Sequence, residues 1–315
     1  MNFMIRGISV AVAVTIAGPL MAAGPLVTAL ELNEMLTEGK VVLLDIRGGA
    51  VGAPEAYAEG HIPGAISTPL GGAPWRGTVD GVPIQRAPIE GLEAHVRGLG
   101  INSDTPVVIY TQGAANNLGD FAGATRAYWT LKSIGHDRVS ILNGGLEGWK
   151  AEGLPVALSA TVASQEGNFR ASLNPAIEAT LADVEVAYAS GAATLLDARP
   201  FAQYTGDAQA SVVKAAGTIP GAVNATAVHF MDGNMIVDRA AVQAKMALIG
   251  LTPNDPIITF CNGGYFCTAM WFVAHEVGGF GNVKVFDGSM AEWTLDPARD
   301  VAPGSWASLH TVLTN

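Results

Sequence analysis

Charged residues and cysteines are both scarce in this chain of 315 residues. Only 14% of the residues are charged, and 17 basic against 28 acidic residues give a net charge of −11. Phosphate binding needs clustered Lys and Arg, so this balance argues against nucleic acid as a partner. Two cysteines are too few for a disulfide framework or a Cys-rich zinc site, and the six histidines include no H-x-x-x-H pair. We expect neither a metal ion nor another cofactor.

Hydrophobic residues, by contrast, make up 49% of the chain. This content excludes a disordered chain, and the length is sufficient for two ordinary domains with full cores.

The N-terminus has the pattern of a secretory signal peptide. After Met1–Arg6, an uncharged run extends from Gly7 to Leu30 and is most apolar over Ile8–Ala17. Small residues that suit cleavage end at Ala23. We therefore expect residues 1–23 to be removed and the protein to be exported, to the periplasm in a Gram-negative bacterium, without stable membrane insertion. An uncleaved membrane anchor is the alternative, although the apolar run is shorter than the ~20 residues of a typical span.

The rest of the chain contains one unit twice. Four segments recur in the same order, at offsets of 144 to 157 residues. The matching segments are Val41–Arg47 with Ala193–Arg199, Ile62–Ala65 with Ile219–Ala222, Pro106–Tyr110 with Pro256–Phe260, and Asn143–Gly145 with Asp287–Ser289. Because the four matches keep the same order and their offsets differ little, they indicate two homologous domains.

Each copy alternates short β-branched runs with helical patterns, which is typical of parallel strands joined by crossover helices. The sequence thus predicts an α/β fold with two tandem domains, each a mainly parallel sheet flanked by helices. We place the first domain at 24–156, a polar linker at 157–168 and the second domain at 169–315. In the second copy we expect helices at Asn174–Ser190, Asp238–Ile249 and Thr268–Val277, and strands at Ala193–Asp197, Pro256–Phe260 and Asn282–Phe286.

Cys261 directly follows the apolar strand Pro256–Phe260, at the edge where open parallel sheets bind ligands. The loop Asn262-Gly263-Gly264-Tyr265-Phe266 leads from Cys261 into a helix. Glycines let successive amides converge on one point, and the helix start adds its positive dipole end. Such an environment lowers the pKa of a thiol, so we expect Cys261 to be a nucleophilic thiolate rather than a buried structural cysteine.

The chain resembles the tandem-domain rhodaneses, the thiosulfate and 3-mercaptopyruvate sulfurtransferases, over nearly its whole mature length. The first half carries Asp45-Ile46-Arg47, Gly60-His61-Ile62-Pro63-Gly64-Ala65 and Asn143-Gly144-Gly145-Leu146-Glu147-Gly148-Trp149. The second half carries Asp197-Ala198-Arg199, Ile219-Pro220-Gly221-Ala222 and Asp287-Gly288-Ser289 with Trp293.

The resemblance implies a catalytic cysteine in the second domain, at Cys261, and an inactive first domain. The counterpart of Cys261 in the first domain is Thr111, which cannot carry a persulfide. The loop after Thr111 is also longer, so we do not expect a ring of amides around position 111.

The active loop departs from the family in having no charged residue, and a second family arginine falls on Gln203. Arg199 is then the leading cation in the motifs of the second domain. We predict Arg199 and the loop residues Asn262, Gly263, Gly264, Tyr265 and Phe266 as the substrate-binding set. The alternative is that Asp197 and Arg199 form a purely structural ion pair.

Cys267 lies six residues after Cys261 and is either a small core residue or a resolving thiol that attacks a Cys261 persulfide. The same position excludes a cysteine phosphatase, whose C-x5-R loop would need arginine there.

The predicted function is an exported sulfurtransferase. Cys261 would take a sulfane sulfur from thiosulfate or 3-mercaptopyruvate as a persulfide and pass it to cyanide, a thiol or a protein acceptor. Two alternatives remain open, a non-catalytic sulfur carrier and a dithiol redox protein that uses Cys261 and Cys267.

Overall fold

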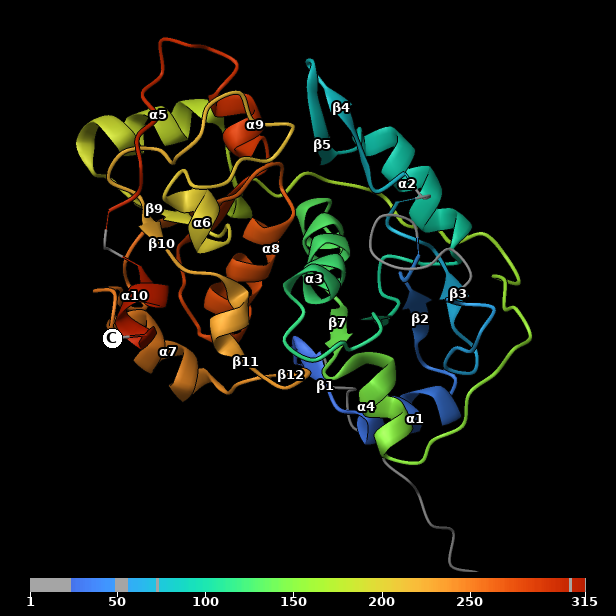
Figure 1. Cartoon of the computed structure of the whole chain (residues 1–315). Coiled ribbons are helices and arrows are strands. Elements are labelled where there is room, and N and C mark those ends of the chain that lie inside the picture. Colours follow the sequence, from blue (N-terminus) through green and yellow to red (C-terminus); the bar gives the residue numbers. More distant parts are fainter. Residues whose placement is uncertain (1–23, 49–55, 72–73, 306–307, 315) are drawn as a thin grey trace, which may run out of the picture.

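The computed structural model describes residues 24–48, 56–71, 74–305 and 308–314. The signal peptide predicted at 1–23 lies outside these residues. Two parallel sheets of five strands each form the framework of the described chain, one in each half (Figure 1). The prediction of two tandem α/β units is confirmed.

The two sheets have the same strand order. The first sheet runs β1 (Leu26–Val27), β7 (Val139–Leu142), β6 (Val107–Tyr110), β2 (Val42–Asp45) and β3 (Ile66–Ser67). The second runs β8 (Glu178–Ala179), β14 (Val283–Phe286), β13 (Ile257–Phe260), β9 (Thr194–Asp197) and β10 (Val223–Asn224). The central strands β6 and β13 are buried at every residue, as expected for strands covered on both faces.

Helices flank both sheets. The first half contains α1 (Ala29–Thr37), α2 (Ile89–Gly98), α3 (Leu118–Ser133) and α4 (Gly145–Ala151). The second half contains α5 (Leu181–Ser190), α6 (Phe201–Tyr204), α7 (Arg239–Ala247), α8 (Phe266–Trp271), α9 (Ser289–Trp293) and α10 (Leu309–Thr314), with 3-10 turns at Pro175–Ile177 and Ala227–Phe230. None of the helices in the described residues combines the length and apolarity needed to cross a bilayer.

Two of the predicted helices needed correction. The segment predicted as one helix over Asn174–Ser190 is divided into the turn Pro175–Ile177, strand β8 and helix α5. The division has a local cause, because Thr180 and Asp183 form a capping box that starts α5 only at Leu181. The helix predicted at Thr268–Val277 begins earlier, at Phe266, and continues from Phe272 to Val277 as the π-helix η4.

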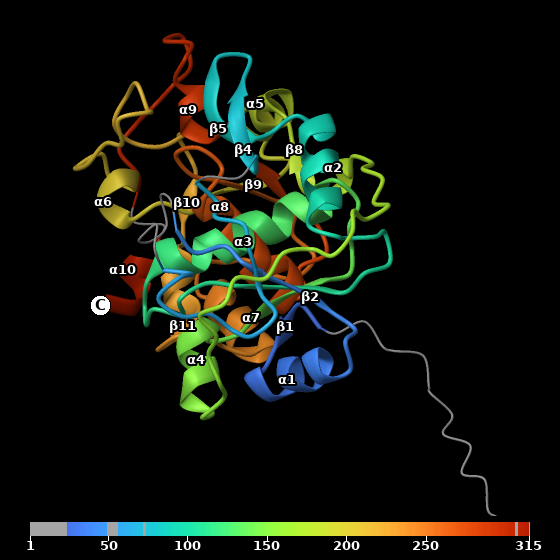
Figure 2. The ribbon, with the colours of Figure 1, turned by 90° about the vertical axis from the view of Figure 1, so that its right-hand side faces the viewer.

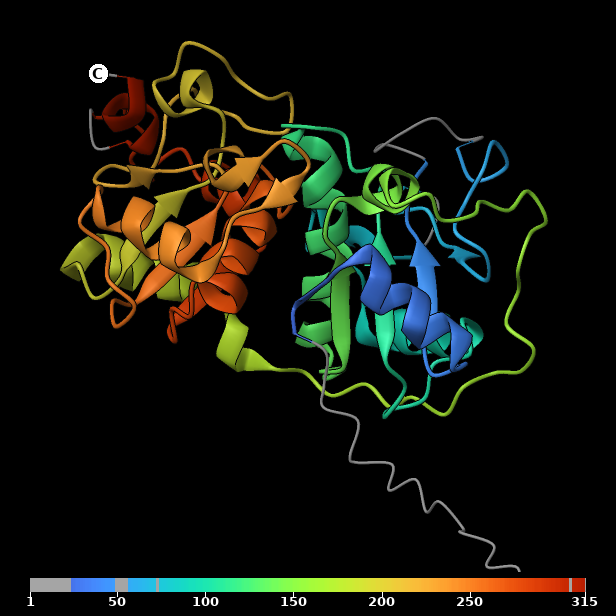
Figure 3. The same cartoon turned by 90° about the horizontal axis from the view of Figure 1, so that it is seen from below.

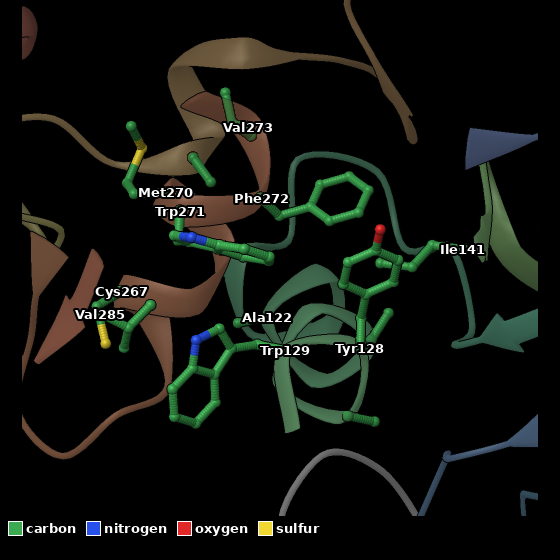
Figure 4. Close-up of a cluster of buried hydrophobic side chains, with 14 of the residues drawn as sticks. Ala122, Tyr128, Trp129, Ile141, Cys267, Met270, Trp271, Phe272, Val273 and Val285 are labelled. Atoms are coloured by element: carbon green, nitrogen blue, oxygen red, sulfur yellow. The ribbon is translucent and has the colours of Figure 1, made fainter. Parts of the chain in front are cut away.

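The halves meet along α3 and the α8–η4 pair, which lie side by side in the centre of the molecule (Figures 1 and 2). Tyr128 of α3 packs edge-on against Phe272, with ring centroids 4.9 Å apart, and Trp271 lies beside it (Figure 4). One hydrophobic cluster contains buried residues of both halves. Burial of apolar surface therefore joins the two sheets into one core.

The predicted linker runs over the outside of the first half (Figure 3). Its first residue, Ala157, exchanges backbone hydrogen bonds with His61, and the His61 ring also contacts the carbonyl of Ser159. These contacts attach the start of the linker to the first half.

Two antiparallel hairpins complete the fold, β4 (Arg76–Val79) with β5 (Val82–Arg86) and β11 (Met231–Asp232) with β12 (Met235–Ile236). The β4–β5 hairpin belongs to the first half but reaches α9 of the second (Figures 1 and 2). It therefore lies close to the residues that follow β13.

Candidate functional site: Cys261 and the loop after β13

Cys261 is the first residue after the central strand β13, and only 1% of its surface is exposed. The loop that follows carries the chain into α8 at Phe266. The amide of Tyr265 donates to the Cys261 sulfur over 3.2 Å. The nucleophile predicted from the sequence thus lies at the carboxyl edge of a parallel sheet, where a helix begins.

The Cys261 thiol is unusually acidic for a buried group. Burial alone would raise its pKa, but hydrogen bonds from the Cys267 thiol and from the amides of Cys267, Gly263 and Tyr265 outweigh that effect. Their combined result lowers the pKa from 9.0 to about 6. At neutral pH the sulfur is therefore mainly a thiolate, which is the reactive form.

The side chain of Ser289 fixes Cys261 and the active loop, Asn262–Phe266, by hydrogen bonds. Its hydroxyl oxygen accepts hydrogen bonds from the amides of Cys261 and Gly264, at 3.0 and 3.3 Å. Ser289 is fully buried and has a φ of 52°, which is uncommon for a residue other than glycine. This conformation places its side chain under the loop instead of in solvent.

A buried arginine of the first half also supports the loop. Arg126 of α3 donates to the carbonyl of Gly264 over 2.6 Å and forms an ion pair with Asp287. Asp287 in turn accepts from the backbone amide of Arg86 in β5. A side chain on Gly264 would collide with both members of this pair, which explains the glycine at that position. The loop is therefore fixed by contacts from both halves.

Cys267 lies at the start of α8 with its sulfur 3.6 Å from that of Cys261. It is fully buried, and both cysteines are free thiols. Burial and the neighbouring Cys261 raise the pKa of Cys267 well above its ordinary value. Cys267 is thus a protonated thiol that donates to the Cys261 thiolate.

The equivalent loop of the first half is built around a carboxylate. Thr111 occupies the position of Cys261, directly after β6. The amides of Gln112, Gly113 and Ala114 point at the carboxylate of Asp120, at 2.7 to 3.2 Å. The anion at this site is a side chain of the protein itself, and Thr111 offers no thiol.

Arg199 is held in an ion pair. Its guanidinium contacts the carboxylate of Asp197 at 2.6 Å and the carbonyl of Gly217 at 2.7 Å, and only 2% of its surface is exposed. The first half repeats this arrangement with Arg47, Asp45 and the carbonyl of Gly60. The Nε and Nη2 donors of Arg199 are thus engaged by groups of the protein itself. A substrate-binding role for Arg199 stays a prediction.

A cavity of about 290 Å³ opens beside Cys261. Its lining residues are Arg76, Ile84, Ala210, Val212, Cys261, Asn262, Gly263, Tyr265 and Phe266. Four of the five predicted loop residues take part, and the exception is Gly264, which lies against Arg126 behind the loop. Asn262 also donates to Gln203 over 2.8 Å.

Sequence reasoning missed the contribution of the first half to this site. Arg76 and Ile84 come from the β4–β5 hairpin, and Arg126 comes from α3. None of the three belongs to a repeated motif, so no pattern in the sequence marked them. Asp287 and Ser289 did belong to one, but their recurrence indicated only the repeat. Within the described residues, no group of three or more His, Cys, Asp or Glu side chains could hold a metal ion.

Both halves of the chain match the same protein family. The model of the rhodanese-like domain matches residues 28–152 and again residues 180–296.

Curated relatives match along nearly the whole chain. The thiosulfate sulfurtransferase of Azotobacter vinelandii is 31% identical over 280 residues, which cover 86% of this chain and 94% of that protein. The 3-mercaptopyruvate sulfurtransferase of Escherichia coli K12 is 28% identical over 278 residues, covering 86% of this chain and 95% of that protein. The crystal structure of SseA from Escherichia coli, a 3-mercaptopyruvate sulfotransferase with the rhodanese fold, superposes with a TM-score of 0.73 at 27% identity, covering 85% of this chain and 99% of the other.

Proposed function

The chain belongs to the rhodanese family and is a sulfurtransferase of the thiosulfate and 3-mercaptopyruvate type, and we propose that it works through a persulfide on Cys261. The observation that carries this proposal is the Cys261 sulfur, which is surrounded by amide donors, has a pKa of about 6 and faces a cavity. A thiolate activated in this way needs no histidine as a general base.

In the first step, the Cys261 thiolate attacks the transferable sulfur of the donor. With thiosulfate, Cys–S⁻ and S₂O₃²⁻ give Cys–S–S⁻ and sulfite as the S–S bond of the donor breaks. With 3-mercaptopyruvate, the C–S bond breaks, the thiol proton passes to the carbon, and the products are Cys–S–S⁻ and pyruvate. The amides of Gly263, Tyr265 and Cys267, which lower the pKa of the thiol, also stabilise the negative charge on the terminal sulfur. Their orientation is fixed before the reaction by Ser289 and Arg126.

In the second step, an acceptor takes the terminal sulfur and releases the Cys261 thiolate. Cyanide, a small thiol or a thiol of a protein partner can each act as the acceptor. Because donor and acceptor react in turn with one cysteine, this scheme predicts ping-pong kinetics.

Intact mass spectrometry tests the proposal directly. The reduced protein is incubated with thiosulfate and separately with 3-mercaptopyruvate, beside Cys261→Ser. We expect a gain of one sulfur atom that cyanide removes and that Cys261→Ser does not show. Multiple turnovers with a small acceptor would support an enzyme, whereas loading without turnover would favour the non-catalytic carrier. No sulfur gain with any donor would overturn the proposal.

The 3.6 Å separation of the two sulfurs favours a second function, in which Cys267 resolves the persulfide. Cys267 would attack the inner sulfur of Cys261–S–SH, forming the Cys261–Cys267 disulfide and releasing H₂S. No external oxidant is needed, because the sulfane sulfur is reduced as the two thiol sulfurs are oxidised. A dithiol reductant then resets the pair. In Cys267→Ser, persulfide loading should persist while sulfide release without added acceptor stops, and unchanged release would contradict this function.

We also propose that the protein is exported after removal of residues 1–23, on the pattern of the sequence alone. The first described strand, β1, begins at Leu26, so this cleavage leaves both sheets complete. The N-terminal sequence of the protein isolated from the periplasm or the medium tests the proposal. A protein that keeps Met1 and sediments with membranes would favour the uncleaved anchor.

A further inference from the structure

Asp120, in the first turn of α3, is a buried carboxylate that the persulfide mechanism does not use. Only 7% of its surface is exposed. Its oxygens accept hydrogen bonds from the amides of Gln112, Gly113 and Ala114, at 3.2, 2.7 and 3.0 Å. These charge-assisted bonds, together with the positive end of the helix dipole, stabilise the carboxylate. They also attach the start of α3 to the loop that follows β6.

The same loop is fixed by the helix cap and by the second half. The side chain of Asn117 caps α3 by accepting from the amide of Asp120 at 3.1 Å. The amide of Asn116 donates to the carbonyl of Gly233, in the turn of the β11–β12 hairpin, over 2.8 Å. The first turn of α3 therefore has a defined position, which depends on Asp120 at its centre.

The residue before Asp120 contacts the active loop directly. The hydroxyl of Tyr265 donates to the carbonyl of Gly119 over 2.8 Å. Burial raises the pKa of Tyr265, with a smaller contribution from the negative charge of Asp120, so the hydroxyl stays protonated and able to donate. The guanidinium of Arg76 lies over the same ring, 5.5 Å from the centroid. The Tyr265 side chain is therefore held by two groups of the first half.

The backbone of Tyr265 contacts the reactive sulfur. Its amide donates to Cys261 over 3.2 Å and is one of the donors that lower the pKa of the thiol. Its carbonyl accepts from the hydroxyl of Thr268 at 2.7 Å. Hydrogen bonds weaken as their distance and angle depart from the optimum, so a displaced Tyr265 ring would weaken the bond from its own amide to the sulfur.

We propose that Asp120 is a positioning residue for Cys261. It holds Gly119 at the place where that carbonyl fixes Tyr265, and the Tyr265 amide therefore stays directed at the sulfur. This inference rests on the proposed persulfide function, in which the Cys261 thiolate is the nucleophile, and adds a residue of the first half that helps to keep the sulfur ionised. Asp120 does not touch the reacting atoms, so its effect should appear in the acidity of Cys261.

The test is the pH dependence of Cys261 alkylation by iodoacetamide. In Asp120→Asn and Asp120→Ala we expect the midpoint to rise by about 0.5–1 pH unit, roughly the effect of one hydrogen bond. Tyr265→Phe should give a rise of similar size. The double variant Asp120→Ala/Tyr265→Phe should show no larger rise than Tyr265→Phe alone, because both changes remove the same contact. Asp104→Ala, on an exposed side chain, is the matched control and should leave the midpoint unchanged.

Formate provides a chemical rescue, because it has the charge and shape of the carboxylate that Asp120→Ala removes. Sodium formate should return the midpoint of Asp120→Ala to that of the parent protein. It should also raise the melting temperature of this variant, since a ligand that binds only the folded state stabilises it. In the parent protein, whose loop amides are occupied by Asp120, the same concentration of formate should change neither value.

The outcomes separate this proposal from the persulfide function. An unchanged midpoint in folded Asp120→Ala would overturn it, as would a shift that Tyr265→Phe does not reproduce. Formate that restores the melting temperature but not the midpoint would overturn it as well. If Asp120→Ala does not fold, Asp120→Asn is judged by the same criterion. Sulfur loading of the parent protein is measured independently, so a failure to load would end the persulfide function while the pH profiles still decide the role of Asp120.

Discussion

Under the proposed persulfide mechanism, the role of Cys267 depends on the state of Cys261. In the free protein its thiol donates to the Cys261 thiolate and so helps to keep that sulfur ionised. Once Cys261 carries a persulfide, that thiolate is gone and Cys267 is the thiol next to an electrophilic sulfur. One residue can thus activate the nucleophile and later resolve the product.

The activating role predicts a change in pH dependence. The thiolate is the reactive form, so the rate of Cys261 alkylation by iodoacetamide should rise with pH through about 6 and level off above it. Cys267→Ala removes a hydrogen-bond donor to the thiolate, so the midpoint of the pH profile should move to higher pH. Cys267→Ser keeps a donor at this position, so its midpoint should stay close to that of the parent protein. The measurement is the alkylation rate between pH 4 and 9, and an unchanged midpoint in Cys267→Ala would contradict the activating role.

At the level of single residues, the sequence pointed to Cys261 as the candidate nucleophile but not to the residues that surround it. Cys261 could be found because a cysteine between an apolar strand and a glycine-containing loop that leads into a helix is typical of an activated thiolate. Arg76 and Arg126 could not, because each reaches the site across a domain interface that no local pattern encodes.

Helix α3 acts on the active loop through one side chain. Arg126 is fully buried, and its pairing with Asp287 compensates for the removal of both charges from water. The pair also has a positional role, because Arg126 fixes the carbonyl of Gly264. Breaking a pair in this setting leaves an uncompensated buried charge.

We therefore expect Arg126→Met to lower the free energy of unfolding by about 3–5 kcal/mol and to slow persulfide loading. The double variant Arg126→Met/Asp287→Leu should recover part of the stability, because it removes the orphaned charge, but not the loading rate, because Gly264 still lacks its donor. Urea unfolding and single-turnover loading measure the two effects. A single variant that loses less than about 1 kcal/mol would contradict a strongly coupled pair.

At the level of elements, the strands of the second half were predicted well, whereas the helix predicted over Asn174–Ser190 was wrong because a helix cap divides that segment. The strands β9, β13 and β14 were placed within one residue at each end, because short runs rich in apolar and β-branched residues stand out from the helical patterns around them. The break within Asn174–Ser190 was missed, although Thr180 and Asp183 have the spacing of a capping box, which marks the start of a helix. Pairing of β8 with β14, which depends on distant residues, decides that Glu178 and Ala179 form a strand.

The molecule as a whole is two copies of one fold that share a core. The repeat was readable from four matched segments, and the alternation of strand and helix patterns predicted mainly parallel sheets, whereas the order of the strands comes from the structure. The way the copies pack was not, because α3 is buried on nearly all of its faces and so shows no amphipathic pattern. Only the structure places Tyr128 against Trp271 of α8 and Phe272 of η4 (Figure 4).

A shared core predicts that the two halves unfold together. Trp149 and Trp293 are buried in the first and second halves. The difference in fluorescence between the parent chain and Trp149→Phe, or between the parent chain and Trp293→Phe, therefore reports on one tryptophan of each half during urea unfolding. We expect coincident midpoints.

Phe272→Ala removes the ring that packs on Tyr128 and should lower both midpoints together, at a cost of about 3–5 kcal/mol. Leu248→Ala, on an exposed side chain, is the control and should change stability by less than about 0.5 kcal/mol. If Phe272→Ala moved the midpoint of the second half alone, the halves would be independent domains, and the support that Arg76 and Arg126 give to the active loop would depend on a separable contact.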